Sequence, residues 1–435
     1  MENLDQIIKE EAGKCILCGA CQSVCPVYAE LLDESQVARG RMALLKAVFA
    51  GKLTETDRLD RILSACIGCK ACSAQCPAGS QADSANLAAK LRIRRSEGLP
   101  YYQKILSRQV FSRAKLRSAF AGLLDLLGRK IYAPLSHHRG FQSALPYVRN
   151  GKGRNIPRHS ATPFHKRPFL PPVTGVLKGK VTLFYGCAVD TFYPQWGKEA
   201  VTLLHHAGIE VEVPETQSCC GAPLLFMGDR EGAARMAKQN LAALSGMNTE
   251  AVITLCATCG STLKELYPKL FPGKTPETLA GRIMDFQEYW IQKGLPIPSI
   301  KEKPDNSPPL RVTYHDPCHL NRGMGIREAP RTILQHLPGI EYIEMEDADR
   351  CCGGGGLFSL RHYDLSLKIG RHKVDRIVES GADIVATACP SCQIQLEDLL
   401  RRAGLDTRVV HVCELLHGSE KGKTQFALHR KERKL

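Results

Sequence analysis

The sequence predicts an α+β multidomain protein, with an N-terminal α-helical domain followed by two duplicated α/β units. Two observations predict it. Of 19 cysteines, 18 fall into four ordered groups, and the chain beyond residue 179 repeats one pattern of strands, helices and cysteines. A chain of 435 residues is long enough for about two to four domains. Its composition, 43% apolar and 24% charged, is typical of globular proteins.

The first two cysteine groups share the spacing C-x-x-C-x-x-C-x-x-x-C-P. In two-cluster ferredoxins, this spacing binds three cysteines to one [4Fe–4S] cluster, while the fourth, before proline, reaches the other cluster. Structural zinc and buried apolar cysteine are the alternatives, but zinc sites normally use paired ligands and do not explain the prolines. The rule predicts one cluster on Cys15, Cys18, Cys21 and Cys76, and a second on Cys66, Cys69, Cys72 and Cys25.

Apolar spacing predicts that these motifs lie among helices. Residues 30–52 show helical spacing between the motifs, and two further helices are expected at 82–97 and 101–127. Residues 133–174 are rich in Pro, Gly, His and Arg and predict a basic linker. We therefore expect a helical ferredoxin domain over residues 1–98, with basic helices and a Pro-rich linker over 99–178.

The rest of the chain is an internal duplication. Cys187 and Cys318 begin corresponding cysteine groups 131 residues apart, and the later cysteines keep nearly the same offset. Each copy is expected to alternate strand and helix, which favours a Rossmann-like parallel sheet with the cysteines at the carboxyl ends of its strands. The expected domains are 179–300 and 308–435. The expected strands are 181–187, 211–213 and 251–255, then 311–318, 342–344 and 384–387; the expected helices are 197–208, 229–245, 329–337 and 363–380.

Each copy carries the pattern C…C-C-G…C-x-x-C. The first set is Cys187, Cys219, Cys220, Cys256 and Cys259; the second is Cys318, Cys351, Cys352, Cys389 and Cys392. A zinc site or a redox dithiol is the alternative to an iron–sulfur cluster here. Vicinal cysteines in a turn can reach two irons of one cluster, and Gly221 and Gly353 would let the backbone approach it closely, as cofactor-binding residues.

This pattern resembles the cysteine-rich, or CCG, domain of heterodisulfide reductase. The whole layout is similar to the glycolate oxidase iron–sulfur subunit and to the HdrD type of heterodisulfide reductase subunit. The resemblance implies a non-cubane [4Fe–4S] cluster on the five cysteines of each copy. Some glycolate oxidase subunits lack part of the second C-x-x-C, whereas both are complete here, which leans toward heterodisulfide reductase and leaves the substrate open.

Residues around Cys318 are further candidates. His315, Asp316 and His319 could supply protons as catalytic residues, because histidine titrates near neutrality. A hydrogen-bonded surface histidine is the simpler alternative. The remaining cysteine, Cys413, is expected to be a buried apolar residue on a strand.

Charge and composition limit the partners. The formal net charge is +15, and between residues 90 and 167 the acids are only Glu97 and Asp125. Aromatic residues do not alternate with these bases, so nucleic acid is not expected; an acidic protein or an anionic membrane surface is. No secretory signal or membrane-spanning run is found, so we expect a cytoplasmic protein, or one attached peripherally at the inner face of the cell membrane.

The sequence shows no flavin or nicotinamide fingerprint. We therefore expect an electron-transfer subunit that receives electrons from a separate FAD-containing 2-hydroxy-acid dehydrogenase subunit, for glycolate or lactate, and passes them to a quinone or another carrier. The alternative is a catalytic subunit that reduces a disulfide at non-cubane clusters.

Overall fold

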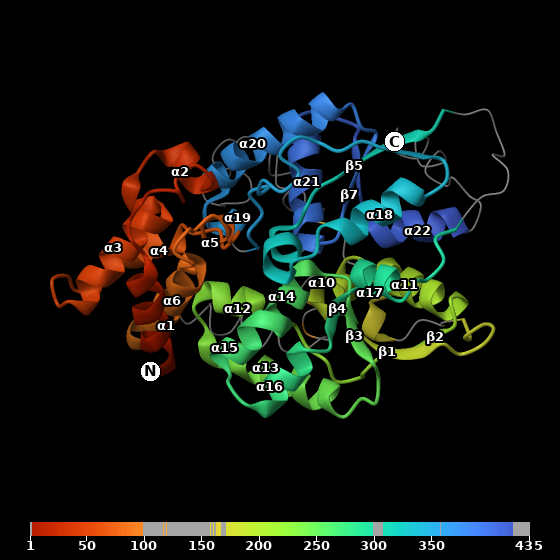
Figure 1. Cartoon of the computed structure of the whole chain (residues 1–435), viewed down its shortest axis with the longest axis horizontal. Coiled ribbons are helices and arrows are strands. Elements are labelled where there is room, and N and C mark those ends of the chain that lie inside the picture. The colour runs from red at the N-terminus through yellow and green to blue at the C-terminus, as the bar shows by residue number, and fades with distance from the viewer. Residues whose placement is uncertain are drawn as a thin grey trace.

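The computed structural model of the chain describes residues 2–98, 116, 119, 157, 160, 162–166, 171–298, 308–356 and 358–420. The described parts form a helical N-terminal domain and two α/β units, which lie side by side in Figure 1. The predicted helix over 101–127 and most of the predicted linker lie outside the described residues.

The N-terminal domain is helical, as the sequence predicts. The predicted helix over 82–97 is confirmed, and the apolar spacing within 30–52 corresponds mainly to one helix, α3. Leu4 and Leu91, from the first and last helices, are buried in one hydrophobic cluster. The helices are α1 (Glu2–Lys14), α2 (Pro26–Leu31), α3 (Ala38–Phe49), α4 (Asp57–Ser64), α5 (Ala71–Ala74) and α6 (Ala82–Glu97), with a 3-10 turn η1 at Glu34–Gln36.

The first α/β unit contains a four-stranded sheet in the order β2-β1-β3-β4, with every pair parallel. Its strands are β1 (Gly179–Phe184), β2 (Ile209–Glu212), β3 (Ala251–Thr254) and β4 (Ile283–Asp285). The helical segments are η4 (Phe164–Lys166), α10 (Gly186–Thr191), α11 (Pro194–His206), α12 (Ala222–Met227), α13 (Arg230–Ser245), α14 (Ala257–Ser261), the π-helix η5 (Thr262–Leu266), α15 (Tyr267–Leu270), α16 (Lys274–Ala280) and α17 (Phe286–Gln292).

The second unit repeats this topology, with strand order β6-β5-β7-β8 and parallel pairs throughout. Its strands are β5 (Leu310–Tyr314), β6 (Ile340–Tyr342), β7 (Ile384–Thr387) and β8 (Arg408–His411). The helical segments are the π-helix η6 (His319–Gly323), α18 (Glu328–His336), α19 (Phe358–Arg361), α20 (Tyr363–Ser380), α21 (Pro390–Arg402) and α22 (Val412–Glu420). The predicted duplication of a parallel α/β unit is confirmed.

The two sheets meet at the ends of their central strands. The backbone N–H of Ala257, just after β3, donates to the carbonyl oxygen of Ala388, just after β7, at 3.1 Å. Val181 of β1, Val312 of β5 and Trp196 of α11 belong to one hydrophobic cluster that includes residues of both units. The carboxyl ends of both sheets, where the sequence places the cysteines, therefore face one another.

The prediction that Cys413 lies on a strand is wrong, although this residue is buried as expected. Strand β8 ends at His411, and Cys413 lies in the first turn of α22. The Glu414 carboxylate accepts the N–H of His411 at 2.8 Å, so a side chain of the new helix satisfies the backbone where the strand stops.

A partly buried ion pair joins the helical domain to the first α/β unit. Lys70 lies directly after Cys69, and its ammonium group is 2.5 Å from the Glu265 carboxylate and 3.6 Å from that of Asp83. The side chains of Lys70 and Glu265 are only 13% and 18% exposed. Lys90 also crosses this boundary, donating to the carbonyl oxygen of Phe226 at 2.9 Å.

Replacing Glu265 with alanine is expected to lower the free energy of unfolding by about 3 kcal/mol, because it leaves the Lys70 ammonium group without its closest counterion. Denaturant unfolding of the iron-loaded chain measures this. The matched control is Glu277→Ala, an exposed glutamate of the same unit, for which we expect a change within about 0.5 kcal/mol. Equal effects of the two changes would contradict a stabilising role for the ion pair.

Basic residues at the start of the segment 90–167 form ion pairs within the protein. Arg92 pairs with Asp5 and Glu55, and Arg94 pairs with Asp60. The remainder of this segment lies largely outside the described residues, so its expected docking role stays a prediction. Among the helices that the structure describes, none is long and apolar enough to span a membrane.

Candidate iron–sulfur sites

The two ferredoxin motifs fold into matching loops. In each, the residues just before and just after the second cysteine have left-handed backbone: Leu17 and Gly19 in the first motif, Gly68 and Lys70 in the second, with φ between 58° and 89°. Left-handed backbone is costly for leucine and lysine, so the same strained turn in both motifs indicates a shared geometric requirement. In both motifs the backbone therefore turns sharply on each side of the second cysteine.

Sulfur atoms of the first motif gather around one cavity. Its wall includes Met42 and Pro77 together with five cysteines, which are Cys15, Cys18, Cys21, Cys72 and Cys76. Both Cys72 and Cys76 of the second motif thus lie beside three cysteines of the first, and the exchange of the fourth ligand stays a prediction. The Cys76 sulfur also accepts the N–H of Ser80 at 3.3 Å, and the Cys25 sulfur accepts that of Tyr28 at 3.5 Å.

The five cysteines of the first CCG copy contact one another in sequence. The sulfurs of Cys187 and Cys219 are 3.5 Å apart. Cys220 makes side-chain contacts with Cys219 and with Cys259, and Cys259 in turn contacts Cys256. Five sulfur donors from three separate loops therefore converge on one small region, although they span residues 187–259 of the sequence.

The second copy has the same chain of contacts. Cys351 contacts Cys318 and Cys352, and Cys392 contacts both Cys352 and Cys389. The repetition of this arrangement across two copies indicates that it is a property of the unit.

Two further contacts connect the groups to each other. Cys256 of the first copy contacts Cys389 of the second, where the two sheets meet. Cys69 of the second ferredoxin motif contacts Cys351, and this contact is the largest cause that lowers the pKa of Cys69 to about 7. The cysteine groups therefore form a continuous series from the helical domain, through the second copy, to the first.

The donor set fits an iron–sulfur cluster. In each copy the second vicinal cysteine, Cys220 or Cys352, has its pKa held well below the usual thiol value, chiefly by contact with Cys219 or Cys351 and then with Cys259 or Cys392. The same contacts raise the pKa of the neighbouring thiols Cys219 and Cys351, so they show that the vicinal sulfurs lie close together. Soft sulfur donors gathered in a buried site are what an iron–sulfur cluster requires.

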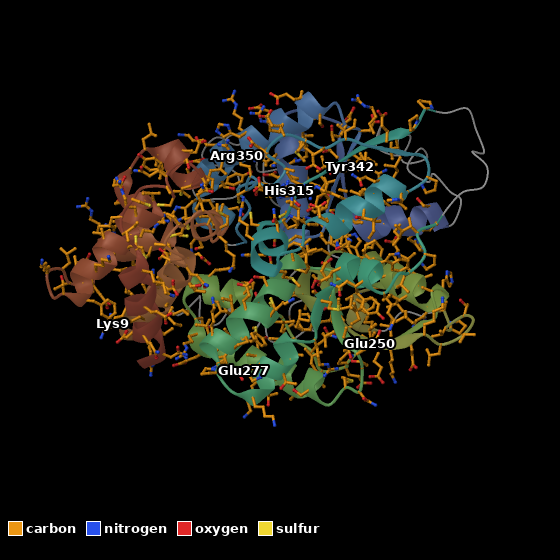
Figure 2. All side chains as sticks on the ribbon, viewed as in Figure 1. Lys9, Glu250, Glu277, His315, Tyr342 and Arg350 are labelled. Carbon is orange, nitrogen blue, oxygen red and sulfur yellow. The ribbon has the colours of Figure 1, made fainter. Side chains whose placement is uncertain are left out.

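His315 also belongs to this region. It is fully buried, and among the residues that the structure describes neither ring nitrogen makes a hydrogen bond of ordinary geometry. One ring nitrogen and the sulfurs of Cys352 and Cys392 all lie within 4.8 Å of one another. Figure 2 shows His315 well inside the molecule, among the segments of the second α/β unit.

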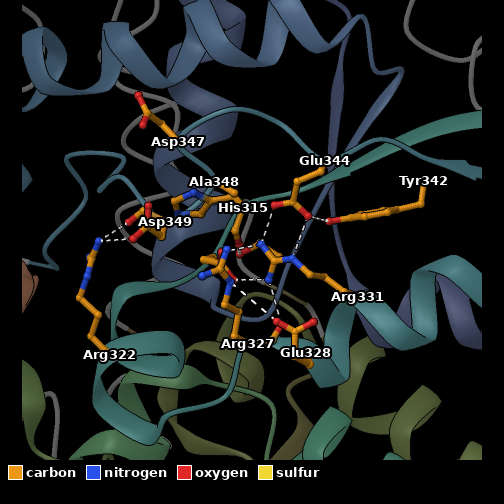
Figure 3. Close-up of polar contacts among 12 residues, drawn as sticks. His315, Arg322, Arg327, Glu328, Arg331, Tyr342, Glu344, Asp347, Ala348 and Asp349 are labelled. Carbon is orange, nitrogen blue, oxygen red and sulfur yellow. Dashed lines mark hydrogen bonds and ion pairs between the residues drawn. The ribbon is translucent and has the colours of Figure 1, made fainter. Parts of the chain in front are cut away.

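Asp316 is engaged elsewhere. Its carboxylate accepts two hydrogen bonds from the Arg331 guanidinium, at 2.9 and 2.7 Å, and both side chains are almost completely buried. Arg331 also binds Glu344, which accepts the hydroxyl of Tyr342 (Figure 3). This arrangement fixes the loop that begins after β5, and Asp316 is not directed at the cysteines.

His319 joins three parts of the protein. Its ring lies 3.2 Å from the hydroxyl of Thr258 and 3.2 Å from the carbonyl oxygen of Gly68, and Thr258 is itself 3.5 Å from the sulfur of Cys389. Burial lowers the pKa of His319 below its usual value. The structure thus brings His315 and His319 toward the cysteines and Asp316 away from them, while their proton-donating role stays a prediction.

The two glycines predicted to face a cluster have helices beside them. A Cβ at Gly353 would lie 2.5 Å from the carbonyl oxygen of Ser366 in α20, and one at Gly221 would lie 3.5 Å from Ala233 in α13. Both have positive φ, of 82° and 88°. Two other glycines border thiols: a Cβ at Gly186 would lie 2.9 Å from the sulfur of Cys259, and one at Gly354 would lie 3.6 Å from the sulfur of Cys352.

Sequence reasoning missed several residues that hold the sites together. Arg322 donates to the carbonyl oxygens of Cys69 and Asp349 at 3.4 and 2.9 Å, so it fastens the second ferredoxin motif to the second CCG copy. Figure 3 shows its pairing with Asp349. Thr258 and Lys70 were missed as well. The only sign of them in the sequence is their position: Thr258 lies inside a C-x-x-C motif, and Lys70 follows Cys69.

Comparison with known proteins agrees with this architecture. The cysteine-rich domain family matches residues 181–264 and 312–397, and the 4Fe-4S dicluster domain family matches residues 11–80. The probable glycolate oxidase iron-sulfur subunit of Bacillus subtilis is 30% identical over 429 residues, covering 93% of each chain.

Two other relatives match part of the chain. A subunit of the fumarate reductase (CoM/CoB) of Methanothermobacter marburgensis is 38% identical over 238 residues, which is 54% of this chain and 46% of the relative. Lactate utilization protein A of Geobacillus thermodenitrificans is 33% identical over 238 residues, covering 55% of this chain and 98% of the relative.

The architecture is that of an oxidoreductase subunit with a 4Fe-4S dicluster domain and two cysteine-rich domains. The chain belongs to the family of the glycolate oxidase iron-sulfur subunit, as its full-length similarity to the Bacillus subtilis protein shows.

Proposed function

We propose that this chain is the electron-transfer subunit of a complex in which a separate FAD-containing subunit oxidises a 2-hydroxy acid, glycolate or lactate. Electrons would leave for a quinone or another carrier. The names of two relatives, a probable glycolate oxidase subunit and a lactate utilization protein, support this substrate class. The observation that carries the proposal is the continuous series of cysteine groups across three domains.

The residues that would hold the clusters are those predicted from the sequence. The ferredoxin-type clusters would be bound by Cys15, Cys18, Cys21 and Cys76, and by Cys66, Cys69, Cys72 and Cys25. The CCG-type clusters would be bound by the five cysteines of each copy. When bound, these clusters would carry electrons one at a time. The two electrons that a flavin takes from the substrate could then pass singly to the carrier.

The protein itself sets the spatial order of the cysteine groups and keeps water away from most of those in the CCG copies. The contact between Cys69 and Cys351 places the second CCG copy next to the ferredoxin domain, and the contact between Cys256 and Cys389 places the first copy next to the second. Most cysteines of the CCG copies are buried, whereas Cys18 in the ferredoxin domain is exposed. Electron transfer to or from a partner protein would therefore be most direct at the ferredoxin domain, near Cys18.

Anaerobic co-purification of the tagged chain tests the proposal. A flavoprotein should accompany the iron-loaded chain, and the mixture should reduce a quinone analogue with glycolate or lactate as the electron donor. A chain that purifies with full iron, binds no flavoprotein and leaves both acids unoxidised in a reconstituted mixture would overturn it.

An apolar patch beside Cys18 is the expected contact for the partner. Ile16 and Leu17 are 68% and 40% exposed and border the cavity that Cys18 lines. Replacing Ile16 with lysine is expected to weaken binding of the flavoprotein about tenfold or more, because a charge replaces an apolar contact. Leu53→Lys, at an exposed leucine of the same domain, is the matched control.

Titration by calorimetry or interferometry measures both affinities, and iron content should be unchanged in both variants. If Ile16→Lys binds as tightly as the unmodified chain, the partner does not dock over Cys18.

A second candidate function is reduction of a disulfide by a heterodisulfide-reductase-like site. The presence of all ten cysteines of the two copies favours it, as does the similarity to the fumarate reductase (CoM/CoB) of Methanothermobacter marburgensis. Burial of Cys219, Cys220, Cys351 and Cys352 favours electron transfer instead, since a disulfide substrate must reach its site. Disulfide reduction by the isolated chain with a chemical electron donor would favour the second function.

A further inference from the structure

We propose that the imidazole of His315 binds iron in the second CCG site, beside Cys352 and Cys392. That site would then have nitrogen and sulfur ligands, whereas the first would have sulfur alone. The inference rests on the proposed cluster assignment and goes beyond it, because the sequence pattern assigns only the five cysteines of each copy.

The first observation is that, within the described residues, the His315 ring makes no hydrogen bond of ordinary geometry and the group it interacts with is the thiol of Cys352. Its exposed fraction is 0%. Burying an imidazole without a partner is unfavourable, and buried polar groups in proteins are nearly always satisfied. A metal is a suitable partner, since a ring nitrogen of neutral imidazole is a good ligand for iron.

The second observation is the position of the ring. One ring nitrogen and the sulfurs of Cys352 and Cys392 lie within 4.8 Å of one another. A metal with bonds of about 2.0–2.3 Å to nitrogen and sulfur would hold these atoms about 3.5 Å apart, a separation that a movement of about 1 Å can reach. Histidine replaces cysteine on one iron of Rieske clusters, so a mixed ligand set is chemically reasonable.

The backbone holds His315 in this position. Its N–H donates to the carbonyl oxygen of Ala386 at 2.9 Å, and its own carbonyl oxygen accepts the hydroxyl of Thr387 at 3.3 Å. Both contacts come from β7, which leads directly to Cys389. The ring is therefore set relative to the cysteines by the sheet itself.

The first copy has phenylalanine at the corresponding place. Phe184 at the end of β1 pairs with Thr254 of β3, just as His315 lies beside Thr387 of β7. Phe184 is also fully buried. Phenylalanine cannot bind metal, so the two copies differ at this position in their capacity to supply a ligand. A neutral nitrogen ligand makes a cluster less negative, and we expect the second site to be reduced at a higher potential than the first.

The test is pulsed electron paramagnetic resonance of the full iron-loaded chain, produced with natural nitrogen and with ¹⁵N-labelled histidine. We expect strong nitrogen couplings that change on labelling histidine. The variant His315→Phe, which copies the residue of the first repeat, should lose these couplings. Mössbauer spectra of ⁵⁷Fe-enriched protein should show one iron with changed parameters in the variant.

His411→Gln is the matched control, because His411 is equally buried but its ring contacts the Leu255 carbonyl oxygen and Cys413. It should keep the couplings. Absence of histidine couplings in the labelled unmodified chain would overturn the inference even if the variant fails to fold, and so would couplings that persist in His315→Phe.

Metal analysis separates the two possible failures. Full iron without a histidine coupling overturns only the role of His315. Zinc in place of iron in the second copy overturns the proposed electron-transfer function, and this inference with it.

Discussion

Replacing both Cys219 and Cys220 with alanine is expected to abolish turnover with the proposed flavoprotein partner while leaving the ferredoxin clusters intact. The double substitution removes two of the five sulfurs that converge in the first CCG copy, including the one whose pKa is held low by its neighbours. The predicted ferredoxin ligands end at Cys76 and belong to a separate helical domain. We expect activity to fall by at least about a hundredfold, since removal of a required electron carrier blocks the reaction.

Low-temperature electron paramagnetic resonance of the reduced variant, beside a steady-state assay, measures both outcomes. The control is Cys413→Ala, at a buried cysteine that belongs to none of the four groups; it should keep full iron and near-normal activity. Full activity of the double variant would show that the first CCG site is structural. Loss of every cluster would show that the domains do not load independently.

The same double variant tests the spatial order of the sites. The cysteines of the second copy contact Cys69, and those of the first copy contact the second copy through Cys389, so the second copy should still be reduced when electrons enter from the ferredoxin domain. In Cys351→Ala, by contrast, the first copy should stay oxidised during turnover with the flavoprotein. Rapid freezing followed by spectroscopy distinguishes these results, and reduction of the first copy in Cys351→Ala would contradict the order.

Removal of iron is expected to have the largest effect on stability. Four [4Fe–4S] clusters correspond to about sixteen iron atoms and as many sulfide ions per chain. Without iron, the free energy of metal binding that supports the fold is lost, and the buried thiols of each site are left without their ligand. We expect the thermal midpoint to fall by on the order of 10 °C or more.

Anaerobic metal and sulfide analysis, followed by calorimetry before and after oxidative removal of iron, measures this effect. Reconstitution with iron and sulfide should restore the midpoint. A chain reconstituted under reducing conditions that prefers zinc, or one whose midpoint does not change on loss of iron, would contradict the cluster assignment.

Local patterns predicted most of the elements and the four cysteine groups. Helix 82–97 and strand 384–387 are found at their predicted bounds because apolar periodicity and β-branched runs are local properties of the chain. The short strand β4 was not predicted, since three residues carry too little pattern, and β8 was predicted only as the strand that would hold Cys413. Cys413 was misplaced because the Glu414 side chain, rather than apolar character, ends the strand.

The role of His315 could not be predicted in the same way. The sequence showed a histidine near Cys318, from which we expected a proton donor. Its lack of hydrogen bonds of ordinary geometry among the described residues and its closeness to Cys352 and Cys392 depend on residues 37 and 77 positions away, which only folding brings together. Asp316 looked equally suitable by position, yet Arg331 holds it away from the cysteines.

The sequence by itself predicted the four cysteine groups, because the spacing within each motif is a local property of the chain. It also determined the duplication, since both copies repeat the same spacing. The tertiary structure decided how the groups connect: Cys69 meets Cys351 and Cys256 meets Cys389 because separate domains pack together. Spacing along the chain cannot specify such contacts, since they depend on the packing of whole sheets and helices rather than on the local pattern of any one motif.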